Sequence, residues 1–259
     1  MQLKHGEFST LVSIRLGVDV MEGGQPCGFC GLILDSKGLH CWSCMAGGDA
    51  TAVHNGIRDI FYDYCDRAAL RPSSEAPGVL ADILGRQDRR RPADVLCLSA
   101  LTLARRLPDG SRAVRIEPVC FDFAVINALG QGHRSEMAAG SGSAAEAYDQ
   151  QKRTHLQTER LCAEAGYRFW PVVFETQGGI SKAATEAIQA ISEALAEREH
   201  REPALVRREF KARIAVLMAR SAVRSIRKRE RPRTGIRTPW MDAVESTLRQ
   251  TQEDLAVDL

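Results

Sequence analysis

Arg91-Pro92-Ala93-Asp94-Val95-Leu96-Cys97-Leu98 is a short apolar run with a carboxylate near its start, and Val119-Cys120-Phe121-Asp122-Phe123-Ala124-Val125-Ile126 is a second run of the same kind. Their length and their Val, Ile, Phe and Cys content are typical of buried β-strands, and a proline bounds each on its N-terminal side. Pro108-Asp109-Gly110, between the two runs, is a turn signal. We therefore predict a hairpin of two strands.

Each predicted strand carries one aspartate, Asp94 in the first and Asp122 in the second. A carboxylate inside an apolar strand is costly unless it is paired or binds a metal. Two of them on neighbouring strands are explained if both converge on a divalent cation. The alternative is that Asp94 is an ordinary turn or cap residue and that Asp122 is a salt-bridge partner at a strand end.

The composition is that of a folded globular protein, with 259 residues, 44% hydrophobic content and a formal net charge of +2. No stretch approaches the roughly 18 consecutive apolar residues of a membrane span, and the N-terminus lacks the apolar core of a signal peptide. We therefore expect an intracellular protein without a membrane partner.

The positive charge is concentrated near the C-terminus. About 13 Lys and Arg residues lie between Arg201 and Arg237, against Glu202, Glu209 and Glu230. A basic excess of this size suits the phosphate backbone of a nucleic acid. An ordinary solvated helix face has the same composition, so both interpretations stay open.

Four of the eight cysteines crowd into a short segment, where Cys27-Gly28-Phe29-Cys30 is followed by His40-Cys41-Trp42-Ser43-Cys44. This is the spacing of a zinc site, in which each half offers two ligands and the intervening turn brings them together. Five candidates compete for four positions, so either His40 or Cys41 is spare. The alternative is a set of reduced thiols without metal. A site with four protein ligands has no open position, so zinc would stabilise the fold and would not catalyse.

The remaining elements, predicted from periodicity, caps and breakers, give an α/β order. They are a loop-rich lead-in over 1–25, a zinc knuckle over 26–48, a helix over 52–70, the two strands, a helix over 144–165, a third strand over 167–175, helices over 181–199 and 203–229, and a tail over 231–259. The four cysteines outside the knuckle are expected to be small buried hydrophobic residues.

With its elements in this order, the chain resembles a known family. The motifs that carry the resemblance are the Cys-x-x-Cys, His and Cys cluster, His54-Asn55, Arg91-Pro92-Ala93-Asp94, Asp122, Lys152 and Glu175-x-x-Gly178-Gly179. Together they look like the C-terminal part of reverse-transcriptase polyproteins of site-specific non-LTR retrotransposons. In that part a CCHC zinc knuckle precedes a restriction-enzyme-like endonuclease of the PD-(D/E)XK class. The resemblance covers residues 25–200 and, apart from the cysteine cluster, rests on the order and spacing of the motifs.

The resemblance implies a small mixed sheet flanked by helices, with a restriction-endonuclease-like fold, over 49–200. A basic helix over 201–230 and a flexible tail over 231–259 would follow. The zinc ligands would be Cys27, Cys30, His40 and Cys44, which leaves Cys41 as the spare.

By the same resemblance, Asp94 and Asp122 would bind Mg²⁺, which lowers the pKa of a bound water and stabilises charge on the phosphate. The family's lysine usually lies two residues past the second acid, where this chain has Ala124. Lys152 on the following helix would replace it. An alanine, Ala93, also separates the proline of the motif from its aspartate.

Two further residues are weaker candidates for the same site. Glu75 would add an acidic contact, and His54 would reach the site or a phosphate, although the family's Arg before His-Asn is Val53 here. The alternatives are that His54 is a buried helix-start residue bonded to the backbone and that Glu75 has no catalytic part.

The leading hypothesis is a retroelement-derived, Mg²⁺-dependent endonuclease that nicks DNA in the nucleus, with RNA as a further possible partner. A second hypothesis is a catalytically decayed, zinc-containing nucleic-acid-binding protein. A third is a zinc-stabilised protein-interaction adaptor, which would be favoured if the Arg-rich helix were buried against the core.

Overall fold

A computed structural model describes residues 3–85, 87, 90–106, 112–130 and 134–229 of the chain. It is a mixed α/β protein built on a four-stranded sheet of order β1-β2-β3-β4. The strands are β1 (Pro72–Ser74), β2 (Val95–Arg106), β3 (Arg112–Ile126) and β4 (Arg168–Glu175). β1, β2 and β3 pair antiparallel, whereas β3 and β4 pair parallel. The predicted hairpin and mixed sheet are thereby confirmed, while the turn at Pro108–Gly110 lies outside the described residues.

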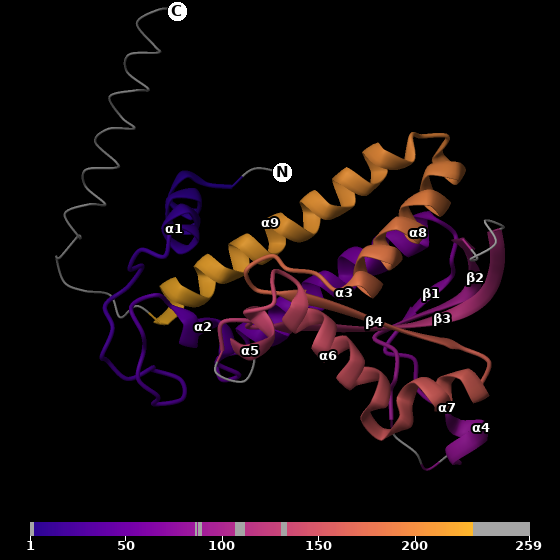
Figure 1. Cartoon of the computed structure of the whole chain (residues 1–259), viewed down its shortest axis with the longest axis horizontal. Helices are drawn as coiled ribbons and strands as arrows, with labels where there is room; N and C mark the ends of the chain where they lie inside the picture. The colour runs from indigo at the N-terminus through magenta and orange to yellow at the C-terminus, as the bar shows by residue number, and fades with distance from the viewer. Residues whose placement is uncertain (1–2, 86, 88–89, 107–111, 131–133, 230–259) are drawn as a thin grey trace, which may run out of the picture. The chain divides into compact units, whose positions relative to one another are not determined.

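The helices fall at both faces and at one end of this sheet. They are α1 (His5–Arg15), α2 (Leu39–Ser43), α3 (Asp49–Arg67), α4 (Ala81–Leu84), α5 (Arg134–Met137), α6 (Ser143–Thr154), the 3₁₀ turn η2 (His155–Gln157), α7 (Thr158–Glu164), α8 (Lys182–Glu199) and α9 (Pro203–Arg229). α3, α8 and α9 cover one face, and α6 and α7 cover the other (Figure 1). Among the described residues, no helix is both long enough and apolar enough to cross a membrane.

Alternation along the strands explains why both faces are covered. In β3, Phe121 and Phe123 belong to the larger core under α3, α8 and α9, while Cys120 and Ala124 face the other side. A central strand with apolar residues on both faces must be buried on both, as in other sheets with parallel pairs. The residue between the two phenylalanines, Asp122, therefore points toward the α6 side.

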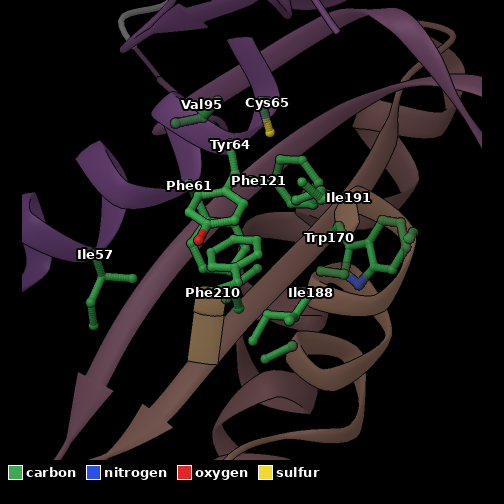
Figure 2. Close-up of a cluster of buried hydrophobic side chains, with 14 of the residues drawn as sticks. Ile57, Phe61, Tyr64, Cys65, Val95, Phe121, Trp170, Ile188, Ile191 and Phe210 are labelled. Carbon is green, nitrogen blue, oxygen red and sulfur yellow. The ribbon is translucent and has the colours of Figure 1, made fainter. Parts of the chain in front are cut away.

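The larger core is aromatic (Figure 2). Tyr64 of α3 stacks on Phe210 of α9 at a centroid distance of 3.9 Å, and Phe61 lies 4.8 Å from both Phe210 and Phe123. Trp170 of β4 is fully buried, and its indole N–H donates to the carbonyl of Ala183 in α8 at 2.8 Å. These contacts fix α3 and α9 against the strands.

The single helix predicted over 144–165 is wrong, because the chain breaks into α6 and α7. Leu156 and Gln157 have φ of 49° and 57°, in the left-handed region, and they turn the chain between the two helices. Helix propensity does not detect this break, since neither residue is a glycine. The turn lets α7 place Leu161 and Cys162 over Cys120 of β3.

The N-terminal part of the chain packs on the C-terminal end of α9. The segment expected to be a loop-rich lead-in contains the helix α1, which contacts α9. Met21, Leu34 and three of the knuckle cysteines form a small apolar cluster with Ile226 of α9, and these three are Cys27, Cys41 and Cys44. Residues Met1–Arg229 form one compact unit, and the predicted tail over 231–259 lies outside the described residues.

Candidate functional site

Four of the residues predicted from the sequence lie together at the end of the β2–β3 ladder. The ladder ends at the pair Val95 and Phe121, so Asp94 immediately precedes it and its main-chain N–H donates to the Phe121 carbonyl at 2.9 Å. Asp94 Oδ2 accepts the N–H of Phe123 at 2.7 Å, which holds this carboxylate beside β3. Asp122 lies between Phe121 and Phe123 on β3, with its side chain on the α6 side.

A histidine and a lysine complete the cluster from opposite faces of the sheet. His54 Nε2, from the second turn of α3, lies 3.1 Å from Asp94 Oδ2 and donates to it. Lys152 Nζ, from the last turn of α6, donates to Asp122 Oδ2 at 2.7 Å. The amine of Lys152, the helix lysine expected to replace a lysine at the position of Ala124, thus points at the second carboxylate.

The pKa values of the two carboxylates are shifted in opposite directions, upward for Asp122 and downward for Asp94. Burial raises the pKa of Asp122, Lys152 lowers it and the nearby Asp94 carboxylate raises it again, so that this pKa lies at about 6. Burial also raises the pKa of Asp94, but the hydrogen bonds from His54 and from the Phe123 N–H outweigh it and hold the pKa below its usual value.

The same contacts raise the pKa of His54. Its hydrogen bond to Asp94 raises this pKa against the opposing effect of burial, and Asn55, whose Oδ1 lies 3.3 Å from Nδ1, adds to the rise. The site is therefore a compact set of two carboxylates, an imidazole and an amine. Two close carboxylates are the ligand type that Mg²⁺ takes from proteins, with waters completing its shell.

Glu75 lies beside this cluster, but its carboxylate is engaged elsewhere. Its main-chain N–H donates to the Asp94 carbonyl at 3.0 Å. Its side chain accepts hydrogen bonds from Arg58 at 2.8 Å and from Arg91 at 2.9 Å. The predicted acidic contact to the site is thus a main-chain contact in this structure, and the carboxylate holds two arginines.

Glu175 is a residue whose role the sequence did not reveal, although it belongs to the Glu-x-x-Gly-Gly motif. It ends β4, is only 2% exposed, and accepts the N–H groups of Gly142 and Ala145 at 3.2 and 3.0 Å. These N–H groups lie at the start of α6, where a carboxylate also meets the positive end of the helix dipole. Glu175 therefore anchors the helix that carries Lys152.

The close packing around Gly179 explains why the last position of that motif is a glycine. A Cβ at this position would lie 1.8 Å from Glu175 Oε2 and 2.8 Å from the Gly142 nitrogen. The main chain also closes a short turn here, because the Glu175 N–H donates to the Gly179 carbonyl at 2.8 Å. The signal in the sequence was a charged residue at the end of an apolar strand followed by two glycines.

The second candidate centre is the cysteine and histidine cluster of the knuckle. One ligand atom each from Cys27, Cys30, His40 and Cys44 lies within 4.8 Å of the others. A tetrahedral zinc with bonds of about 2.0–2.3 Å keeps its ligand atoms within about 4 Å of one another, so this donor set fits zinc after a small contraction. Three thiols and one imidazole are also the ligand chemistry of structural zinc sites.

The structure places His40, and not Cys41, among the gathered ligand atoms. Cys41 is 1% exposed, its thiol contacts the Met21 sulfur at 3.7 Å, and burial raises its pKa to about 12. Burial also acts on Cys27, but the N–H groups of Phe29 and Cys30 and the His40 ring lower that pKa to about 6. The Cys41 thiol thus contacts a thioether and is not among the four ligand atoms that gather in the cluster.

The knuckle is fastened to the rest of the protein on two sides. Asp35 accepts the N–H groups of Leu39 and His40 at 2.9 and 2.7 Å, which caps α2 and orients the histidine. Asp49, at the start of α3, is buried and bonded to Arg229 Nη1 at 2.8 Å. Arg229 also donates to the Ala46 carbonyl at 2.9 Å, so the end of α9 holds the segment that follows the last zinc ligand.

The cations of α9 have two kinds of environment. Arg213 pairs with Asp63 of α3, and Arg224, Lys228 and Arg229 surround Asp49. Other basic residues of the helix are exposed, and these are Arg208, Lys211 and Arg227. Val206, Phe210 and Ile214 form the buried apolar stripe of the same helix, whereas Leu205 is exposed.

Comparisons with protein-family models, with curated proteins and with solved structures find no match for this chain.

Proposed function

We propose that this protein is a metal-dependent DNA endonuclease with a restriction-endonuclease-like catalytic domain, of retroelement origin, that nicks a duplex by hydrolysing a phosphodiester. The observation that carries the proposal is the convergence of Asp94, Asp122 and Lys152, from three separate elements, at the end of one sheet ladder. A structural role alone gives no reason for two carboxylates to share a partly buried site, because each raises the cost of ionising the other.

In this proposal Asp94 and Asp122 hold Mg²⁺. When bound, the ion would lower the pKa of a water molecule and stabilise charge on the phosphate. Lys152 would exchange its hydrogen bond with Asp122 for one to the attacking water or to a phosphate oxygen. His54 would hold Asp94 in place, and its charged ring would favour an anionic substrate beside it.

The DNA partner is supported by the exposed cations of α9. The adaptor hypothesis required the basic face of this helix to be buried, yet Arg208, Lys211 and Arg227 are exposed. In the proposal these residues and the zinc knuckle grip the duplex through its phosphates. The knuckle would act as a rigid part of that surface, since its zinc ligands leave no open position for catalysis.

A plasmid-nicking assay tests the proposal. We expect the zinc-loaded protein to convert supercoiled DNA to the open circle when Mg²⁺ is present. It should not do so in a buffer that contains no Mg²⁺ and a chelator that removes Mg²⁺ but not zinc. Asp94→Ala should abolish nicking with unchanged zinc content and circular dichroism, whereas Asp66→Ala, which removes an exposed carboxylate of α3, should nick like the wild type. Equal nicking by wild type and Asp94→Ala would reject the assignment.

The alternative, a decayed nucleic-acid-binding protein, gives a different result in the same experiment. It predicts DNA binding by the wild type without Mg²⁺-dependent nicking. A measured affinity for DNA without any nicking would favour this alternative.

A further inference from the structure

We propose that Arg58 and Arg91 form a binding site for a backbone phosphate of the DNA, next to the candidate catalytic cluster, and that Glu75 occupies this site when DNA is absent. The inference rests on the proposed function for the identity of the ligand as a nucleic acid strand. It adds a substrate contact and an internal competitor, which the catalytic cluster alone does not contain.

The two guanidinium groups already converge on a single anion. Arg58 Nη1 donates to Glu75 Oε1 at 2.8 Å, and Arg91 Nη1 donates to Glu75 Oε2 at 2.9 Å. A phosphodiester also offers two non-bridging oxygens that share one negative charge, and arginine binds phosphate with the same fork geometry that it uses for a carboxylate. The carboxylate of Glu75 thus stands where two oxygens of a phosphate would fit.

Arg58 is oriented by a neighbouring carboxylate, and Arg91 and Glu75 both lie close to Asp94 in the chain or through a main-chain bond. Asp59 accepts from Arg58 Nε and Nη2 at 3.0 and 2.8 Å, which orients the guanidinium and leaves Nη1 for the shared anion. Arg91 lies three residues before Asp94 in the sequence. Glu75 has a φ of 47°, a conformation uncommon for a residue other than glycine, and its N–H is bonded to the Asp94 carbonyl.

The arginine pair is next to the candidate cluster along the same helix. Arg58 follows His54 by four residues on α3, so the two side chains lie on one face about 6 Å apart along the axis. A strand with one phosphate at Asp94 and Asp122 would present a neighbouring phosphate on the side of the arginines. The pair would therefore set the direction in which the strand crosses the site.

Exchange of the anion should be inexpensive. The Glu75 side chain is 49% exposed and that of Arg91 is 58% exposed, so the carboxylate returns to water when it is displaced. Exposed ion pairs contribute little to stability. Arg58 is only 17% exposed, so its bond to a phosphate would be shielded from solvent and stronger than a fully exposed one.

The test is a binding measurement by fluorescence anisotropy, using the full chain, zinc-loaded, with a short labelled duplex and a Mg²⁺ chelator too weak to remove zinc. Arg91→Ala should weaken binding by about tenfold and reduce the salt dependence by about one phosphate contact. Glu75→Gln removes the competing charge while keeping the shape of the side chain, so it should bind the duplex more tightly than the wild type. Arg160→Ala, which breaks an exposed ion pair on α7, is the matched control and should bind like the wild type.

Two results would overturn the inference. One is an unchanged affinity in Arg91→Ala, relative to wild type and Arg160→Ala. The other is a Glu75→Gln variant that binds DNA as the wild type does but loses Mg²⁺-dependent nicking, which would make Glu75 a part of the catalytic site. If none of the proteins nicks DNA but the affinities change as predicted, the proposed function fails and the phosphate site stands.

Discussion

Gly179→Ala is the substitution whose effect the structure predicts most sharply. The new Cβ would lie 1.8 Å from Glu175 Oε2, a distance that no side chain tolerates, so the buried carboxylate must leave the start of α6. It would lose its hydrogen bonds with Gly142 and Ala145, each involving a charged acceptor. We expect a loss of about 3–6 kcal/mol in the free energy of unfolding, since each of these two hydrogen bonds to a charged group contributes about 1.5–3 kcal/mol.

The effect on the candidate site follows from the position of Lys152 in the last turn of α6. A displaced helix moves the Lys152 amine away from Asp122. Nicking should therefore decrease by a larger factor than the fraction of folded protein does. Gly28→Ala is the control, because a Cβ there meets nothing within 4 Å and φ is not positive. Its free energy of unfolding should change by no more than about 0.5 kcal/mol.

Urea unfolding of the single and double variants provides the assay. Because Gly179→Ala acts mainly through the carboxylate, its cost should shrink by at least about 1 kcal/mol when Glu175→Ala is already present. Some cost should remain, since the Cβ also approaches the Gly142 nitrogen at 2.8 Å. Equal costs in both backgrounds, or no cost at all, would refute the role given to Glu175.

Three further predictions concern the zinc ligands, the pH dependence and the lysine. Cys44→Ser should lose its bound zinc, as measured by elemental analysis. Cys41→Ser should keep the zinc but lose about 1–3 kcal/mol of the free energy of unfolding in urea, because it buries a hydroxyl among apolar groups. Loss of zinc from Cys41→Ser would instead make Cys41 a ligand. In zinc-loaded, Mg²⁺-free protein, Asp122 has a folded pKa of about 6 against an ordinary 3.8, so its stabilising contribution is present below pH 4 and is lost as the pH rises to 6. Asp122→Asn should remove this part of the decline in urea unfolding between pH 4 and 6, and parallel pH profiles would contradict it. Lys152→Met should keep affinity for DNA and lose nicking at least about 100-fold, the usual size of a proton-transfer or positioning contribution; undiminished turnover would exclude the lysine.

The other titrating groups of the site act in different pH ranges. Asp94, whose pKa is lowered, contributes stability above its ordinary value of 3.8 and loses it as the pH falls below that value. His54, whose pKa is raised, contributes stability that is full below 6.5 and lost at higher pH. Among the groups of this site, the window from 4 to 6 therefore reports mainly on Asp122. Burial also raises the pKa of Asp149, but Asp149 is present in both the wild type and Asp122→Asn, so the comparison of the two isolates Asp122.

Much of the fold could be predicted because its elements carry strong local patterns. The apolar run that became β4 and the periodic helices α8 and α9 lie within two residues of their predicted bounds. Buried strands and amphipathic helices can be recognised from their composition and from the period of their apolar residues. The convergence of Asp94 and Asp122 was also predictable, since an unpaired acid in an apolar strand requires a partner.

The rest depends on contacts between residues far apart in the sequence. Nothing local shows that Glu175 caps a helix that begins 32 residues earlier, or that Glu75 would be held by Arg58 and Arg91. The break at Leu156 arises because α7 must cover Cys120, which helix propensity does not include. The choice of His40 over Cys41 likewise needed the burial of the spare thiol against Met21.

The most direct measurement of the central claim is an anomalous diffraction experiment on crystals of the zinc-loaded protein soaked in Mn²⁺, a hard cation that replaces Mg²⁺ and is visible by its anomalous signal. The account predicts a manganese peak bonded to the carboxylates of both Asp94 and Asp122, and a zinc peak within the cluster of Cys27, Cys30, His40 and Cys44. Crystals that bind Mn²⁺ elsewhere, or that leave these two carboxylates without a peak at saturating Mn²⁺, would contradict it.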